Sequence, residues 1–228
     1  MFPLRDDNPS QSVPVVTRAL IALNVVTFLL QQSQGPAYES FVRSWGLVPH
    51  RFALAFAGSE PLAPTLATAL SSMFLHGGWI HLLGNLWYLF IFGDNVEDRL
   101  GHVGFLLFYL AGGLVAAAAH LFSNPGSPVP TVGASGAIAA VLGAYAMLYP
   151  RARVLTLVPV FLFFQVIALP ALLLLALWFV VQIFIGTLSL GSSGGGVAWW
   201  AHIGGFLFGI AVALPLKSPR RSGAWVEK

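Results

Sequence analysis

Six long apolar segments fill most of the chain, and they constrain its fold more than any other feature. A helix needs about 20 residues to cross about 30 Å of hydrocarbon, and each segment is close to that length. Only 8% of the 228 residues are charged, against about 25% in a soluble domain. We therefore predict an all-α polytopic membrane protein that forms a single domain over residues 1–228. Its expected spans are residues 15–32, 79–97, 103–122, 134–149, 170–188 and 199–216.

The basic residues predict how these spans are oriented. With six spans both termini lie on one side, and of the 11 Lys and Arg residues only Arg43 and Arg51 fall on the other. Because basic residues collect on the cytoplasmic side, we expect both termini to be cytoplasmic. The sequence pI of about 9.6 then reflects topology, since the basic residues form no single face or arm for a phosphate backbone. We expect no nucleic-acid partner.

The segments between the spans carry weaker patterns. Residues 33–78 mix aromatic, apolar and polar side chains, so we expect an external loop of short helices along the membrane interface. The turn after the second span holds the densest acidic cluster, which we interpret as a solvated helix end where Glu97 or Asp98 pairs with Arg99.

Two further segments follow the fourth and fifth spans. Pro159 and Pro170 interrupt residues 153–170, so we expect an interfacial cytoplasmic segment, with Pro170 in the first turn of the fifth span. Residues 189–198, "SLGSSGGGVA", are expected to form a mobile external loop because glycine and serine favour flexible chain.

Four polar residues fall at one expected depth on three spans. The second, fourth and sixth spans all run from outside to inside, so their first turns lie at a similar level. His81 and Asn85 share one face of the second span, Ser135 opens the fourth, and His202 lies in the first turn of the sixth. Polar groups inside lipid are costly and mark function by default. This coincidence therefore predicts a functional site near the outer face.

Small residues support close packing at this site. Rows of small side chains spaced four apart let membrane helices approach closely, and such an approach is what a serine and a histidine need to share a hydrogen bond of about 2.6 to 3.2 Å. The two rows are Ser135, Ala139 and Gly143 on the fourth span, and Ala201, Gly205 and Gly209 on the sixth.

The residue types suggest acyl transfer. A serine hydroxyl becomes a strong nucleophile when a histidine takes its proton. No Asp or Glu lies in the outer half of any span, so Ser135 and His202 would act as a dyad rather than as part of a triad. His81, Asn85 and the backbone N–H of Ser135, which opens a helix, can donate to an oxyanion.

Each residue also has a structural interpretation. Ser135 taken alone is more often a packing or capping residue, His202 an interfacial anchor, and His81 and Asn85 a hydrogen-bonded pair between helices. His76 is better explained as bracing a loop than as catalytic. We interpret the remaining histidines as structural, namely His50, His102 and His120.

A metal site is a weaker alternative. His76, His81 and His202 could hold zinc, but the chain has no H-E-x-x-H motif and no nearby carboxylate base. It also has no cysteine, which removes thiolate ligands and disulfides. We expect no metal and no other cofactor.

The sequence resembles the rhomboid family of intramembrane serine proteases. The motifs that carry the resemblance are "HGGWIHLLGN", "GASG" and "AHIGGFLFG", and "VEDRLG" also fits. The resemblance implies a six-helix rhomboid-like bundle of bacterial type, in a bacterial inner membrane, with a wet cavity open to the outer face. It implies Ser135 as nucleophile, His202 as general base, and an oxyanion hole of His81, Asn85 and the Ser135 N–H. The implied partners are the lipid bilayer and transmembrane protein substrates, cleaved in or near their spans.

Two positions depart from the pattern of some family members. A tyrosine that stacks on the histidine is replaced by Ala139, and a Trp-Arg pair in the first loop is replaced by Ala67 and Thr68. Neither change removes a catalytic group. Trp199, Trp200 or Trp87 are the candidates to hold the His202 ring instead.

Our leading hypothesis is a serine endopeptidase. An inactive rhomboid-like protein that binds membrane clients is the first alternative, although such proteins usually lack the serine or the histidine. A channel or transporter is the second alternative, but it would need a polar path across the midplane, and here the polar residues stop in the outer third.

Overall fold

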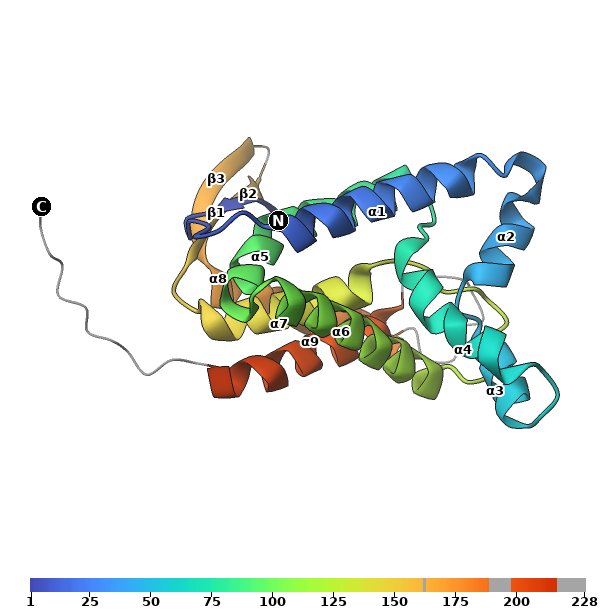
Figure 1. Ribbon diagram of the computed structural model, residues 1–228. Helices are drawn as coiled ribbons and strands as arrows, with labels where there is room; N and C mark the ends of the chain where they lie inside the picture. Colours follow the sequence, from blue (N-terminus) through green and yellow to red (C-terminus); the bar gives the residue numbers. More distant parts are fainter. Residues whose placement is uncertain (162, 189–197, 217–228) are drawn as a thin grey trace, which may run out of the picture.

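A computed structural model describes residues 1–161, 163–188 and 198–216 (Figure 1). Most of the expected loop at 189–198 and the last basic residues of the chain lie outside these ranges. The helices of the bundle are α1 Val15–Gln32, α2 Tyr38–Trp45, α3 Pro49–Phe56, α4 Leu62–Ser71, α5 Trp79–Leu100, α6 His102–Ser123, α7 Ser135–Leu148, α8 Ala171–Leu188 and α9 Trp199–Ala213. Short 3₁₀ turns lie at Gly35–Ala37, Ser72–Phe74 and Leu214–Leu216.

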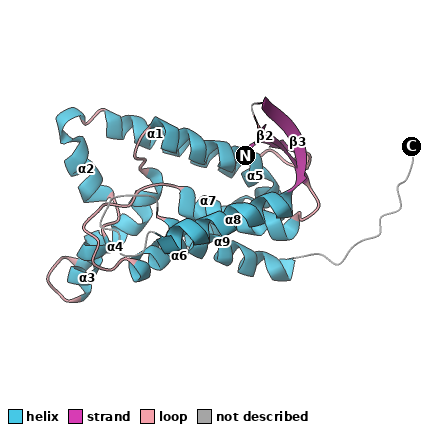
Figure 2. Ribbon diagram, turned by 180° about the vertical axis from the view of Figure 1, so that it is seen from behind, coloured by secondary structure: helices cyan, strands magenta, loops and turns pink. Residues whose placement is uncertain are grey.

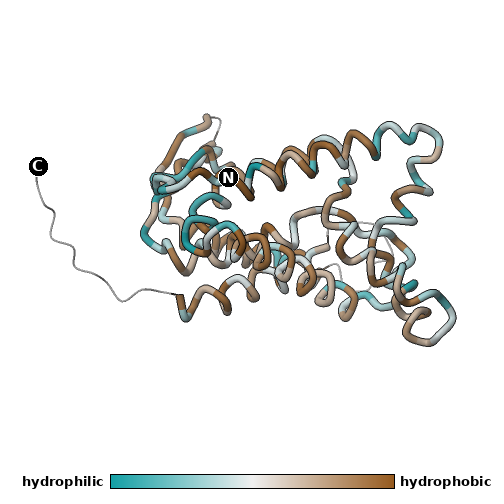
Figure 3. Tube along the Cα trace, viewed as in Figure 1, coloured by the Kyte–Doolittle hydropathy of each residue, from teal (hydrophilic) through white to brown (hydrophobic). Residues whose placement is uncertain are grey.

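Four helices are long and apolar enough to cross a membrane, which makes this a multi-pass membrane protein. They are α1, α6, α8, and α9 with its last turn to Leu216. Hydrophobic residues follow these helices between the two ends of the molecule, and hydrophilic residues gather near the ends (Figure 3).

The count of six spans remains a prediction, because α5 and α7 are not among the helices whose length and composition allow them to cross a membrane. The last turns of α5 carry Asp94, Glu97, Asp98 and Arg99. Helix α7 has 14 residues, or about 21 Å at 1.5 Å per residue. It lies inside the bundle with nearly all its residues buried, so its neighbours rather than lipid surround it.

Helices α7 and α9 pack backbone against backbone. A Cβ atom on Gly205 would overlap the carbonyl oxygen of Gly136, and one on Gly209 would overlap that of Ala140. A Cβ on Gly143 would meet the carbonyl oxygen of Phe206 in the same way. The close approach predicted from the small-residue rows is therefore present, and it holds the first turns of α7 and α9 side by side.

Residues 33–78 form short helices at one end of the bundle, where α2, α3 and α4 lie (Figure 1). This segment is tied to the chain that leads into α7. Leu47 pairs with Thr131 in an antiparallel bridge, and the N–H of Gly133 donates to the carbonyl of Ser72 at 2.9 Å. These bonds fix the position at which α7 begins.

The expectation of an all-α chain is wrong at the other end of the bundle. A three-stranded antiparallel sheet lies there in the order β1 Phe2–Asp6, β2 Arg153–Val160 and β3 Phe163–Pro170 (Figure 2). The segment 153–170 is rich in branched and aromatic residues that favour strands. Pro159 lies beyond the residues of β2 that pair with β1, where the strand has only one neighbour and tolerates proline. Pro170 ends β3, and α8 begins one residue later.

The acidic turn of α5 was also predicted wrongly. Among the described residues neither Glu97 nor Asp98 forms an ion pair with Arg99, whose guanidinium donates to a carbonyl beyond the end of α9. Glu97 instead accepts from the backbone N–H groups of Val16 and Thr17, at 2.9 and 2.8 Å. A carboxylate satisfies the free N–H groups that open a helix, so this glutamate caps α1.

Candidate active site

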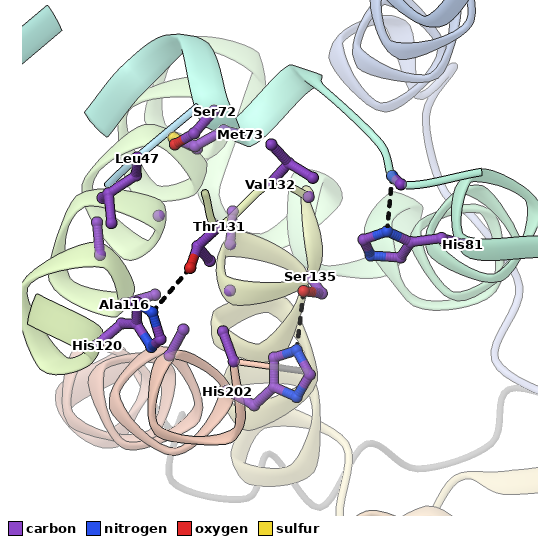
Figure 4. A pocket seen from close by; sticks show the side chains of 18 of the residues that line it. Leu47, Ser72, Met73, His81, Ala116, His120, Thr131, Val132, Ser135 and His202 are labelled. Carbon is purple, nitrogen blue, oxygen red and sulfur yellow. Dashed lines mark hydrogen bonds between the residues drawn. The ribbon is translucent and has the colours of Figure 1, made fainter. Parts of the chain in front are cut away.

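The structure brings the predicted nucleophile and base into contact. Ser135 is the first residue of α7, and His202 is the fourth residue of α9. The Oγ atom of Ser135 lies 2.8 Å from Nε2 of His202 (Figure 4). This distance is within the range at which an imidazole can take a proton from a hydroxyl.

A cavity of about 870 Å³ opens beside these two side chains. Most of the residues in its wall are small or apolar, and its volume leaves room for a peptide backbone. Its polar lining includes Ser72, His81, His120, Thr131, Ser135 and His202. The lining includes residues of the segment 33–78, which places the cavity at the end of the bundle that the sequence predicts to face outward.

His81 faces the cavity with a defined tautomer. Its Nδ1 atom accepts from the backbone N–H of Gly77 at 3.2 Å, so the neutral ring carries its proton on Nε2. A Cβ atom on Gly133 would lie 2.8 Å from Nε2, and the backbone there has φ +133°. Glycine is therefore required at position 133, and the His81 Nε2–H lies close to the chain that leads into Ser135.

Asn85 lies one turn further along α5 and is buried. Its amide nitrogen donates to the carbonyl of His81 at 3.1 Å, and Asn85 is not among the residues that line the cavity. An amide NH₂ has two donors, so one remains for another acceptor. His81, Ser135 and His202 thus share the cavity, with Asn85 behind His81.

The family is decided by a comparison with known domains. A family model described as the Rhomboid domain matches residues 63–219, which is more than half of the chain. The chain belongs to the rhomboid family. The matched region contains Ser135, His202, His81 and Asn85.

Relatives of this rhomboid are found in animals and plants. The chain is 35% identical over 171 residues to presenilin-associated rhomboid-like protein A, mitochondrial, of Danio rerio, covering 70% of this chain and 40% of the relative. It is 27% identical over 214 residues to the Homo sapiens presenilin-associated rhomboid-like protein, mitochondrial, covering 90% and 48%. It is 41% identical over 69 residues to rhomboid-like protein 11, chloroplastic, of Arabidopsis thaliana, covering 30% and 24%.

These relatives limit what carries over to this rhomboid. The chain spans less than half the length of each of them. Their names place them in mitochondria or chloroplasts, so they do not support the expected bacterial inner membrane.

The residues that hold the His202 ring are mostly not those predicted from the sequence. Nδ1 of His202 lies 2.7 Å from Oε1 of Gln182 on α8. The rings of Trp178 and Trp199 lie 5.9 and 6.1 Å from the His202 ring. Of the three tryptophans predicted to hold the ring, Trp199 contacts it, whereas no ring contact among the described residues joins Trp200 or Trp87 to His202. The signal for the missed pair was present: Trp178 and Gln182 are four residues apart, so they share one face of an apolar helix.

Two histidines outside the predicted site lie next to it. His120 lines the same cavity, and its Nε2 atom lies 2.8 Å from the Thr131 hydroxyl. His76 is completely buried, with its backbone held on both sides by the side chain of Gln31. Its ring lies 5.2 Å from that of His81. This arrangement agrees with the prediction that His76 braces the loop.

The burial of His76 predicts a dependence of stability on pH. Burial, together with nearby His81, lowers the pKa of His76 from 6.5 to about 4. Between these values the unfolded chain binds a proton that the folded protein does not, so stability falls as the pH is lowered through this window. The loss is at most about 1.4 kcal/mol per pH unit.

Melting temperatures in detergent between pH 7.5 and 4.5 test this expectation. A variant with His76→Gln should melt at a lower temperature at neutral pH but show a flatter pH dependence than the unmodified protein. His50→Gln, at an exposed position, serves as the control and should keep the original slope. Parallel slopes in all three proteins would contradict the assignment.

Proposed function

We propose that this rhomboid is an intramembrane serine endopeptidase in which Ser135 is the nucleophile and His202 the general base. The observation that carries the proposal is the 2.8 Å contact between Ser135 Oγ and His202 Nε2 in a cavity large enough for a peptide segment. Family membership adds support, because the motifs that the sequence shares with rhomboid proteases include both residues.

The reaction would proceed in two halves. His202 Nε2 takes the proton of Ser135 as Oγ attacks the carbonyl carbon of the scissile peptide bond. The same proton then passes to the leaving amide nitrogen, the C–N bond breaks, and an ester joins Ser135 to the new carboxyl end. A water molecule, deprotonated by His202, attacks this ester and releases the acid product with the Ser135 hydroxyl restored.

The negative oxygen formed in each half needs donors that are already in place. The His81 Nε2–H lies beside the chain that enters α7, and the Ser135 backbone N–H opens the helix and has no intrahelical acceptor. Asn85 has a second amide hydrogen and would have to turn toward the cavity to contribute. We propose His81 and the Ser135 N–H as the principal donors and Asn85 as an additional one.

The proposed substrates are membrane proteins cleaved in or near a transmembrane segment. The cavity lies among helices that are apolar enough to span a membrane. A substrate helix must expose its peptide carbonyl to reach Ser135, so small or helix-breaking residues near the cleavage site are expected. Both termini of this rhomboid would be cytoplasmic, with the site open to the opposite side of the membrane.

The alternative is a rhomboid-like protein that binds membrane clients without cutting them. Serine-directed labelling separates the two functions. We expect a fluorophosphonate probe to label the purified wild type in detergent and not to label Ser135→Ala. It should label His202→Ala at a rate at least about 100-fold lower than the wild type. Labelling that persists in Ser135→Ala, or an unreactive wild type that still binds transmembrane peptides, would favour the alternative.

A further inference from the structure

We propose that Gln182 on α8 is a positioning residue for His202, and that its amide takes the place of the acid found in a serine protease triad. The inference rests on the proposed function, because positioning matters only if His202 acts as a base. Both side chains are buried, with 5% of Gln182 and 7% of His202 exposed. Their contact at 2.7 Å is therefore shielded from water, which would otherwise compete for it.

The contact selects the tautomer that catalysis needs. An amide oxygen only accepts, so Gln182 Oε1 requires a hydrogen on Nδ1 of His202. The neutral ring then has a lone pair on Nε2, which is the atom 2.8 Å from the Ser135 hydroxyl. The opposite tautomer would present an N–H to Ser135 and could not take its proton. Gln182 thus does for His202 what the aspartate does in a triad.

Helix α8 also supplies a ring that limits rotation of the imidazole. Trp178 lies four residues before Gln182, on the same face, with its ring 5.9 Å from His202 and tilted by 35°. Trp199 approaches the ring nearly at right angles. Ala139, where some family members carry a stacking tyrosine, offers no comparable surface. Among the described residues, the amide and the two indoles are therefore the groups that orient the base.

Because Gln182 is neutral, a charged residue at the same position tests the proposal. Both ring nitrogens of His202 face neutral partners, and the titratable groups that act on it are two other histidines, His81 on α5 and His120 on α6. A carboxylate at position 182 would favour the protonated imidazole through its negative charge. Gln182→Glu should therefore keep the orientation of the His202 ring. It should also move the acid limb of the pH–rate profile, which is the fall in cleavage rate at low pH, to higher pH.

The experiment measures cleavage of a single-pass test substrate in liposomes from pH 5 to 9. We expect Gln182→Leu to lower kcat by about tenfold to 100-fold with little change in KM, as is typical when the partner that orients a histidine is lost. Gln182→Glu should have most of the wild-type kcat at high pH, and its cleavage rate should begin to fall at a higher pH than that of the wild type. Thr187→Val is the control, because Thr187 is exposed on α8 and its hydroxyl donates to the carbonyl of Phe184 in the same helix, its one hydrogen bond among the described residues.

The outcomes separate this inference from the proposed function. If wild-type cleavage depends on Ser135 but both Gln182 variants keep the wild-type kcat and pH profile, the positioning role is wrong and the protease assignment stands. If Gln182→Leu lowers the melting temperature and Gln182→Glu restores stability without shifting the acid limb, Gln182 has only a structural role. If the wild type shows no Ser135-dependent cleavage, the proposed function itself fails.

Discussion

Replacing Ser135 with alanine is expected to reduce cleavage of a transmembrane substrate by about 10³-fold or more, because no other nucleophile among the described residues lies against His202. The described partners of the His202 ring nitrogens are Ser135 and Gln182, and an amide does not replace a hydroxyl in this role. The fold should be unaffected, since the serine is only partly buried. The measurement is the rate of fragment release in liposomes, with the melting temperature measured in parallel.

Ser123→Ala is the matched control for this experiment. Ser123 also lies on a spanning helix, but its hydroxyl donates to the carbonyls of Ala119 and His120 within α6 and accepts from the side-chain amide of Asn124 just after it. Its loss should leave the cleavage rate within about twofold of the wild type. Fragment release that survives in Ser135→Ala at a comparable rate would mean that another group performs the attack.

Replacing Gly209 with alanine is expected to cost about 3 kcal/mol of stability, because the added methyl group would overlap the carbonyl of Ala140 across the interface of α7 and α9. The helices must separate or shift to admit it. Since the same pair of helices carries Ser135 and His202, the contact between those two side chains should be lost as well. The melting temperature and fluorophosphonate labelling should therefore fall together.

Gly84→Ala controls for the change of residue type. Gly84 lies in the second turn of α5, and a Cβ atom there would have no neighbour within 4 Å. Alanine favours helix more than glycine does, so this variant should melt at the same or a slightly higher temperature. If Gly209→Ala melts at the same temperature as Gly84→Ala, the backbones of α7 and α9 are not in close contact at Gly209.

The sequence could predict that these polar residues meet, because six predicted spans give the second, fourth and sixth the same direction. His81, Ser135 and His202 each fall in the first turn of a helix that runs the same way, so their depth follows from counting. The rows of small residues then predict which helices approach closely, and the overlaps around Gly205 and Gly209 agree.

The neighbours of His202 could not be predicted in the same way, because their contacts depend on how α8 is rotated. Helix α8 is apolar on nearly every face, so hydropathy does not show which side faces the bundle. The pair of Trp178 and Gln182 marks that side once the structure is known. The sequence suggested Trp199, which does contact the ring, but also Trp200 and Trp87. The Trp87 indole instead donates to the carbonyl of Pro3 at the sheet end of the molecule.

The sheet was missed because its segments look like interfacial chain in a sequence dominated by helices. Residues 153–170 are apolar without a clear alternation, and β1 is a short stretch near the N-terminus. The pairing between Phe2 and Leu157 joins residues far apart in the chain. Contacts of this kind follow from tertiary structure rather than from any local pattern.

Rates of cleavage by the wild type, Ser135→Ala, His202→Ala and the double variant test most directly whether the two side chains act as one unit. If Ser135 and His202 share one proton transfer, the double variant should be no slower than the worse of the two single variants. A double variant in which the two losses multiply, or in which cleavage continues at the wild-type rate, would contradict the account.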